Sequence, residues 1–173
     1  MLPFAVLDTS VLILLCTDQV DQSEKEVEAQ HRREATRDWI EHLAPRVRFA
    51  VPTPAVAELS RPKTAAAFLE ELARAVGRFR VLPLTRSAAE VAAKMAAQRI
   101  AARPTGAERG AVKYDTLIAA IAHDVGARYV VTDDRRDYGS PLRAVSSPVE
   151  IVVASTPPPG QQMNLIEMPK RKK

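Results

Sequence analysis

Four acidic residues lie beside apolar segments, where an unpaired carboxylate is costly to remove from water. Asp8 and Asp134 each come at the end of an apolar run, and Glu58 and Asp115 lie within alanine-rich apolar segments. Four carboxylates that converge would offer a hard divalent cation, Mg²⁺ or Mn²⁺, the oxygen ligands it prefers. A site of this kind can cleave phosphodiesters, so metal-dependent hydrolysis is the chemistry to test against the rest of the sequence.

Each of the four acids also has a purely structural interpretation. Asp8 and Asp115 could cap helices, Asp134 could be a turn residue, and Glu58 could be an ordinary exposed helical glutamate. These interpretations are plausible one at a time. The joint pattern is harder to explain in this way, because all four acids would have to fall beside apolar segments independently.

The apolar pattern of the chain alternates between short runs and longer segments of helical periodicity. The short β-branched runs predict five strands, at 4–7, 48–51, 80–82, 128–131 and 149–153. The longer segments predict six helices, at 10–15, 24–43, 53–61, 64–76, 87–102 and 113–125. Ser87 and Glu90 have the spacing of a capping box at the start of the fifth helix. Alternation of this type predicts a three-layer α/β/α sandwich with a central, mostly parallel sheet.

The expected fold places the acids. In an open α/β sheet, ligands bind beyond the carboxyl ends of the strands. Asp8 and Asp134 follow two predicted strands, and Glu58 lies on a helix that leaves the same edge. Asp115 lies near the start of a predicted helix, and the residues on the same face of that helix are apolar. The Asp115 side chain is therefore expected to face the sheet. The four carboxylates should therefore meet at one edge.

Composition sets the broader limits. The chain has 173 residues, of which 46% are hydrophobic and 27% charged, as expected for one globular domain. No apolar stretch is long enough to cross a membrane, no signal peptide is recognisable, and the single cysteine cannot form an internal disulfide. We expect a cytoplasmic protein with a domain at 1–154 and a proline-rich, basic extension at 155–173.

The net charge of +4 equals the charge of the last four residues, so the rest of the chain is neutral overall. A nucleic-acid surface would therefore depend on local clusters of basic residues. The candidate RNA-binding residues are Arg109, Lys113, Arg135 and Arg136. Their alternative interpretation is an ordinary solvated surface.

Four segments together resemble the motifs of the PIN-domain ribonucleases. They are 8–10 (DTS) after the first strand, 54–59 (PAVAEL), 114–120 (YDTLIAA) and 132–138 (TDDRRDY). Each segment is a weak signal, but their order matches that of the family motifs from about residue 2 to residue 153. The subgroup most similar is the VapC-like toxins of toxin–antitoxin pairs.

The resemblance implies cleavage of single-stranded or loop RNA with Mg²⁺ or Mn²⁺ as cofactor, leaving 5′-phosphate and 3′-hydroxyl ends. It implies catalytic roles for Asp8, Glu58, Asp115 and Asp134. The metal ligands would be Asp8, Asp115 and Asp134, with Asp133 as the competing candidate for the fourth acid. Ser10, Thr132 and Asp133 would support the ligands from behind, although capping would explain the two hydroxyls equally well.

The toxin-like resemblance further implies a cognate antitoxin protein and a homodimer. Two alternatives remain within the same fold. One is a housekeeping RNA-processing nuclease, and the other is a non-catalytic module that binds RNA or protein. The intact set of four acids argues against the non-catalytic module. Other acid-dependent α/β classes fit less well, because the Asp-x-Asp of a haloacid-dehalogenase-like phosphatase is absent at residues 8–10.

Overall fold

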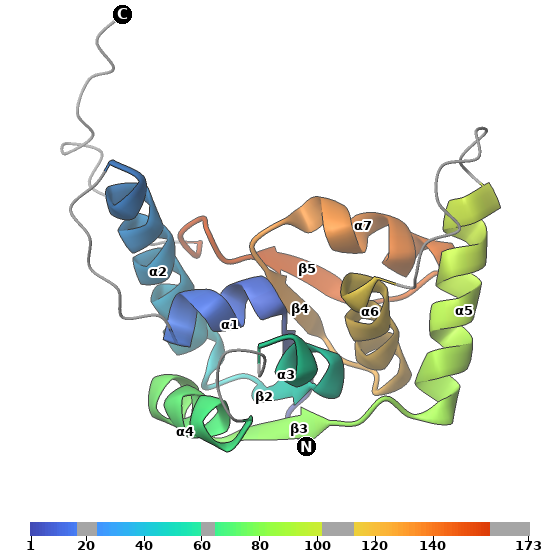
Figure 1. The fold of residues 1–173 in the computed structure, drawn as a ribbon, viewed down its shortest axis with the longest axis horizontal. Helices are drawn as coiled ribbons and strands as arrows, with labels where there is room; N and C mark the ends of the chain where they lie inside the picture. Colours follow the sequence, from blue (N-terminus) through green and yellow to red (C-terminus); the bar gives the residue numbers. More distant parts are fainter. Residues whose placement is uncertain (17–23, 60–64, 102–112, 160–173) are drawn as a thin grey trace, which may run out of the picture.

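The computed structural model describes residues 1–16, 24–59, 65–101 and 113–159 (Figure 1). The strands are β1 (Phe4–Leu7), β2 (Arg48–Pro52), β3 (Phe79–Leu82), β4 (Tyr129–Thr132) and β5 (Glu150–Val153). The helices are α1 (Thr9–Cys16), α2 (Glu24–Leu43), α3 (Thr53–Leu59), α4 (Ala65–Val76), α5 (Arg86–Ala101), α6 (Tyr114–Asp124) and α7 (Arg135–Ala144). No helix among the described residues is long and apolar enough to cross a membrane.

The five strands form one parallel sheet in the order β3-β2-β1-β4-β5. The chain moves outward from β1 to β2 and β3, then returns to pair β4 on the other side of β1. The strand order therefore reverses between β1 and β4. In sheets of this kind, a ligand crevice opens at such a reversal, beyond the carboxyl ends of the two strands.

The helices form two groups that cover the sheet. Helix α1 contacts α2, α3 and α4, and helices α5 to α7 contact one another, while α3 also contacts α6. Figure 1 shows α1, α2 and α4 on one side of the strands and α5, α6 and α7 on the other. The core between them is aliphatic, with Val6, Leu7, Val51, Ile118 and Val131 fully buried. The expected α/β/α sandwich is confirmed, and the sheet is parallel throughout.

Local sequence explains where several helices begin and end. Thr53 and Pro54 open α3 directly after β2, and proline is well tolerated in the first helical turn because its missing N–H has no partner there. Gly77 and Gly126 follow the ends of α4 and α6 with φ of 70° and 59°. This left-handed conformation ends a helix with little strain only at residues such as glycine.

Two local predictions were wrong or missing. The cap of α5 is Thr85 rather than Ser87, because the Thr85 hydroxyl accepts a hydrogen bond from the Ala88 amide at 3.0 Å. Helix α7 was not predicted at all. It contains Gly139 and Pro141, two residues that normally argue against a helix interior, and it forms nevertheless over ten residues.

The chain after β5 remains in contact with the domain as far as it is described. The Trp39 indole N–H of α2 donates to the Thr156 carbonyl at 2.5 Å, and Pro158 is buried. The division into 1–154 and 155–173 stays a prediction, since residues 160–173 lie outside the described part of the chain.

Candidate active site

Asp8 is the centre of the candidate site. It follows β1 directly and is only 5% exposed. Its Oδ1 accepts hydrogen bonds from the Thr9 amide at 2.7 Å and from the Tyr138 hydroxyl at 2.6 Å. Its Oδ2 accepts from the hydroxyls of Ser10 at 2.7 Å and Thr132 at 2.9 Å. Four donors aimed at one carboxylate fix its orientation and offset the cost of its burial.

Two of these donors come from the far end of the sequence. Thr132 ends β4, which pairs with β1, and Tyr138 lies one turn into α7 with its side chain fully buried. Burial raises the pKa of the Tyr138 hydroxyl well above 10, and the neighbouring Asp8 carboxylate raises it further. The hydroxyl therefore keeps its proton and remains a donor to Asp8.

Glu58 is brought to the same place by α3. Its Oε2 accepts a hydrogen bond at 2.8 Å from the hydroxyl of Thr9, the residue after Asp8. Thr9 therefore touches both acids, the one through its amide and the other through its side chain. This contact spans 49 residues and joins α1 to α3.

Asp115 lies in the first turn of α6 and is partly buried. Its pKa is raised to about 6, first by burial and then by the carboxylates of Asp137, Asp8 and Glu58, in that order, while Lys113 opposes the rise. The raised pKa shows that these carboxylates share one region of negative potential. Ionisation of Asp115 is therefore disfavoured in the folded protein.

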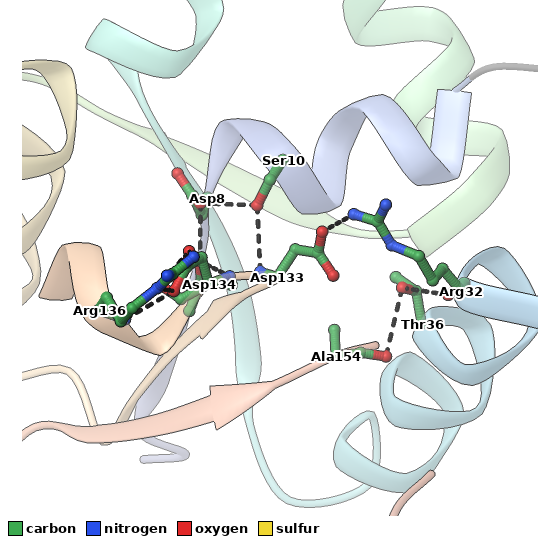
Figure 2. A network of polar contacts seen from close by, with 9 residues as sticks. Asp8, Ser10, Arg32, Thr36, Asp133, Asp134, Arg136 and Ala154 are labelled. Carbon is green, nitrogen blue, oxygen red and sulfur yellow. Dashed lines mark hydrogen bonds and ion pairs between the residues drawn. The ribbon is translucent and has the colours of Figure 1, made fainter. Parts of the chain in front are cut away.

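Asp134 is engaged elsewhere. It is the N-cap of α7, and its Oδ1 accepts from the Arg136 amide at 2.8 Å. The Arg136 side chain also pairs with both of its oxygens (Figure 2). These Arg136 contacts lower the pKa of Asp134 to about 2. Asp134 therefore caps a helix that was not predicted, whereas its structural alternative in the sequence was a turn residue. An exposed ion pair such as the one with Arg136 can open at little cost.

Two of the three predicted supporting residues, Ser10 and Thr132, contact Asp8. Ser10 and Thr132 both donate to its Oδ2, and both also accept amide protons, Ser10 from Asp133 at 3.1 Å and Thr132 from Asp134 at 3.2 Å. Asp133 does not face Asp8 with its side chain, which pairs instead with Arg32 of α2 (Figure 2).

The candidate RNA-binding residues are less well defined. Lys113 and Arg135 are exposed beside Asp115 and Asp134, where they could meet a phosphate. Arg136 is exposed but paired with Asp134. Arg109 lies outside the described residues.

Sequence reasoning did not find the roles of Tyr138, Asp137 and Arg32. Tyr138 was only an aromatic residue that completes a motif, and nothing in the sequence indicates that its hydroxyl reaches Asp8. Asp137 is exposed, and of the three carboxylates that raise the pKa of Asp115 it contributes most. The only signal was its position one turn after Asp134, on the same face of a helix that was not predicted.

The donor chemistry of the site fits a hard divalent cation. Asp8, Glu58, Asp115 and Asp137 supply oxygen ligands only. The pKa of Asp115 is raised first by burial and then by carboxylate repulsion, and a cation would relieve that repulsion. Helices α1, α6 and α7 begin at this edge, and the positive ends of their dipoles favour the ionised acids. As placed, no three acid, histidine or cysteine side chains in the described part of the chain meet closely enough to hold a metal ion.

Comparison with known proteins finds solved structures of similar architecture. No protein-family model and no curated protein matches the sequence. Among solved structures, the chain is similar to VapBC2 from Rickettsia felis bound to a DNA fragment from its promoter, with 15% identity, a TM-score of 0.57, and coverage of 86% of this chain and 98% of that chain. It is also similar to DNA-bound VapBC from Salmonella typhimurium, with 21% identity, a TM-score of 0.52, and coverage of 87% and 98%.

The chain has a PIN-like fold. Identities this low show the shared architecture alone, but the match extends over nearly the whole of both solved chains. In this PIN-like fold the reversal between β1 and β4 is where Asp8 and its donors lie. The fold expected from the four motifs is therefore confirmed, and the roles of the acids stay predictions.

Proposed function

We propose that the protein is a metal-dependent endoribonuclease that cleaves single-stranded or loop RNA. The main observation behind the proposal is that two acids near the sheet reversal have different environments. Asp8 is buried and held by four hydrogen-bond donors, and the pKa of Asp115 is raised first by burial and then by neighbouring carboxylates. A fixed carboxylate beside a repelling group of acids suits a cation better than it suits a structural core.

Each acid would have a separate role in metal binding or proton transfer. Asp8 and Asp115 would hold Mg²⁺ or Mn²⁺, with Asp134 as the third ligand once its contact with Arg136 opens. A bound cation of this kind stabilises charge on a phosphate and lowers the pKa of water. Glu58, fixed by Thr9, would orient the attacking water and accept its proton.

The hydroxyls of Ser10, Thr132 and Tyr138 would keep Asp8 in one orientation during the reaction. Lys113 and Arg135 would contact the phosphates that flank the cleaved bond, because both are exposed at the edge that carries the acids. Arg109 belongs to the same proposal from sequence alone.

The activity can be tested with the purified chain on single-stranded RNAs and structured tRNAs, in Mg²⁺, Mn²⁺ or EDTA. We expect cleavage with either metal and none with EDTA, and we expect 5′-phosphate product ends. Asp8→Asn and Asp115→Asn should each abolish cleavage in a folded protein. Equal cleavage in EDTA would refute the metal mechanism, and absence of cleavage with tight RNA binding would favour a non-catalytic module.

We further propose that the nuclease is the toxin of a toxin–antitoxin pair and acts as a homodimer in the cytoplasm. The support is the likeness of the fold to two VapBC complexes. A cognate antitoxin would present an arginine or a similar cation to the acidic region and compensate its charge. Expression of the chain with its neighbouring gene should give a co-purifying small protein that inhibits cleavage. A monomer without such a partner would favour the housekeeping nuclease.

A further inference from the structure

Two neighbouring acids after β4 each pair with an arginine, and the two arginines lie on different helices. Figure 2 shows Asp133 pointing toward Arg32 on α2, while Asp134 meets Arg136 on α7. The first pair is the more buried, with side-chain exposures of 40% for Arg32 and 14% for Asp133. The second pair has 89% for Arg136 and 37% for Asp134. The inner pair is therefore shielded from water and salt more than the outer one.

The inner pair is connected to Asp8 through Ser10. The Asp133 amide donates to the Ser10 hydroxyl at 3.1 Å, and that hydroxyl donates to Asp8 Oδ2 at 2.7 Å. Thr132, which precedes Asp133 in the chain, donates to the same oxygen at 2.9 Å. A displacement of Asp133 would therefore move both hydroxyls that hold this side of the Asp8 carboxylate.

The other end of this connection is firmly anchored. Helix α2 packs against α1. The Thr36 hydroxyl, one turn after Arg32, is fully buried and donates to the Arg32 carbonyl at 2.7 Å and to the Ala154 carbonyl at 3.5 Å. Trp39 lies on the same helix, and its indole N–H donates to the carbonyl of Thr156. Arg32 thus extends from a fixed helix to the loop that carries Asp133.

We infer that Arg32 is a positioning residue of the site: its ion pair with Asp133 fixes the loop after β4 and, through Ser10, the orientation of Asp8. Asp133 is then a structural anchor rather than a fourth metal ligand. Asp134 is then the acid that can exchange Arg136 for a metal ion, because its exposed pair with Arg136 can open without disturbing Asp8. The coupling itself is a property of the metal-free chain, and only its effect on metal affinity rests on the proposed function.

The coupling can be measured in the full-length, metal-free protein by urea unfolding of Arg32→Gln, Ser10→Ala and the double variant. Distant residues without shared partners normally give additive effects, whereas members of one hydrogen-bond network do not. We expect the double variant to lose no more stability than the worse single variant, because either change disconnects Arg32 from Asp8. Additive losses in urea midpoint would overturn the inference. Arg32→Lys, which keeps the charge, should retain most of the midpoint and guards against a glutamine variant that fails to fold.

The effect on the site can be measured with Mn²⁺ alone by isothermal titration calorimetry. Removal of groups that orient metal ligands commonly weakens metal binding by about 10- to 100-fold. We expect a loss of about 10-fold for Arg32→Gln, about the same for the double variant with Ser10→Ala, and a smaller loss for Arg32→Lys. The matched control is Arg37→Gln on the next turn of α2, an exposed arginine without an ion pair among the described residues.

The outcomes separate the two proposals. Wild-type affinity for Mn²⁺ in a folded Arg32→Gln protein, or an equal loss in Arg37→Gln, would overturn the positioning role. A wild-type chain that does not bind Mn²⁺ would refute the proposed metal mechanism, while the urea measurements would still decide whether Arg32 and Ser10 are coupled.

Discussion

Asp115→Asn should make the metal-free protein more stable at neutral pH. The pKa of Asp115 is raised from 3.8 to about 6, so the folded state favours its protonated form. The stability associated with this proton is fully present below about pH 4 and is lost as the pH rises through about 6. At pH 8 the ionised Asp115 therefore destabilises the fold, and an uncharged isostere removes that cost.

The expected gain in stability follows from the pKa shift of Asp115. A change of about 2 pKa units corresponds to roughly 3 kcal/mol. Asp115 is only half buried, and solvent screening at such a position reduces the effect, so we expect a gain of roughly 1 to 1.5 kcal/mol at pH 8. For a domain of this size each kcal/mol raises Tm by about 2–4 °C.

The assay is urea unfolding in EDTA at pH 4 and pH 8, for the wild type and the variant. The gain should be present at pH 8 and nearly absent at pH 4. Added Mg²⁺ should then stabilise the wild type more than the variant, since ligand binding to the folded state adds stability. Asp134→Asn is the control, because the pKa of Asp134 is lowered to about 2 and its ionised form is the favoured one. It should give no gain at pH 8.

A loss of stability in Asp115→Asn at pH 8 would refute this reasoning and would favour a capping role for Asp115. A gain of equal size at both pH values would also contradict it, because the effect would then not depend on the ionised carboxylate.

Three other predictions concern the rest of the site and the tail. Asp8→Asn should lower stability in EDTA by about 1–3 kcal/mol, because four donors are arranged for a carboxylate; unchanged urea unfolding would show that the hydroxyls rotate to suit the amide. Tyr138→Phe should cost about 1.5–3 kcal/mol, since it removes a hydrogen bond to a buried charged group, whereas Tyr129→Phe should cost less in the same urea measurement. Deletion of the residues after Met168 should leave the single-turnover cleavage rate at saturating enzyme unchanged, but it should weaken RNA binding and flatten its salt dependence. A collapse of the saturated rate would instead place the tail within the site.

The sequence predicted the sheet well because buried parallel strands read as short apolar runs. All five strands were found, with bounds within one residue of those observed. Six of the helices were found for a similar reason. Helix α7 was not, because Gly139 and Pro141 suggest a turn, whereas its packing on α5 and α6 and the burial of Tyr138 and Leu142 overcome that local preference.

The site was predictable in part. Asp8 follows a strand at the sheet reversal, so topology alone indicates its place. The neighbours of Asp8 were not fully predictable, because hydrogen bonds such as Tyr138 to Asp8 join residues 130 positions apart. The choice among Asp133, Asp134 and Asp137 depends on where α7 begins. A one-residue shift turns a helical side chain by about 100°, and the sequence does not fix that boundary so closely.

The wide separation of the Asp8 donors in sequence has a consequence for synthesis of the protein. Thr132 and Tyr138 follow Asp8 by 124 and 130 residues, so they leave the ribosome later than Asp8 does. Until β4 and α7 have formed, the Asp8 carboxylate lacks two of its four partners, and β1 lacks its neighbour on one side. A nascent chain should therefore carry no organised site, and the proposed cleavage should begin only after β4 and α7 have been synthesised and have folded onto β1. The proposed inhibitor would therefore be needed only from the point at which α7 has folded.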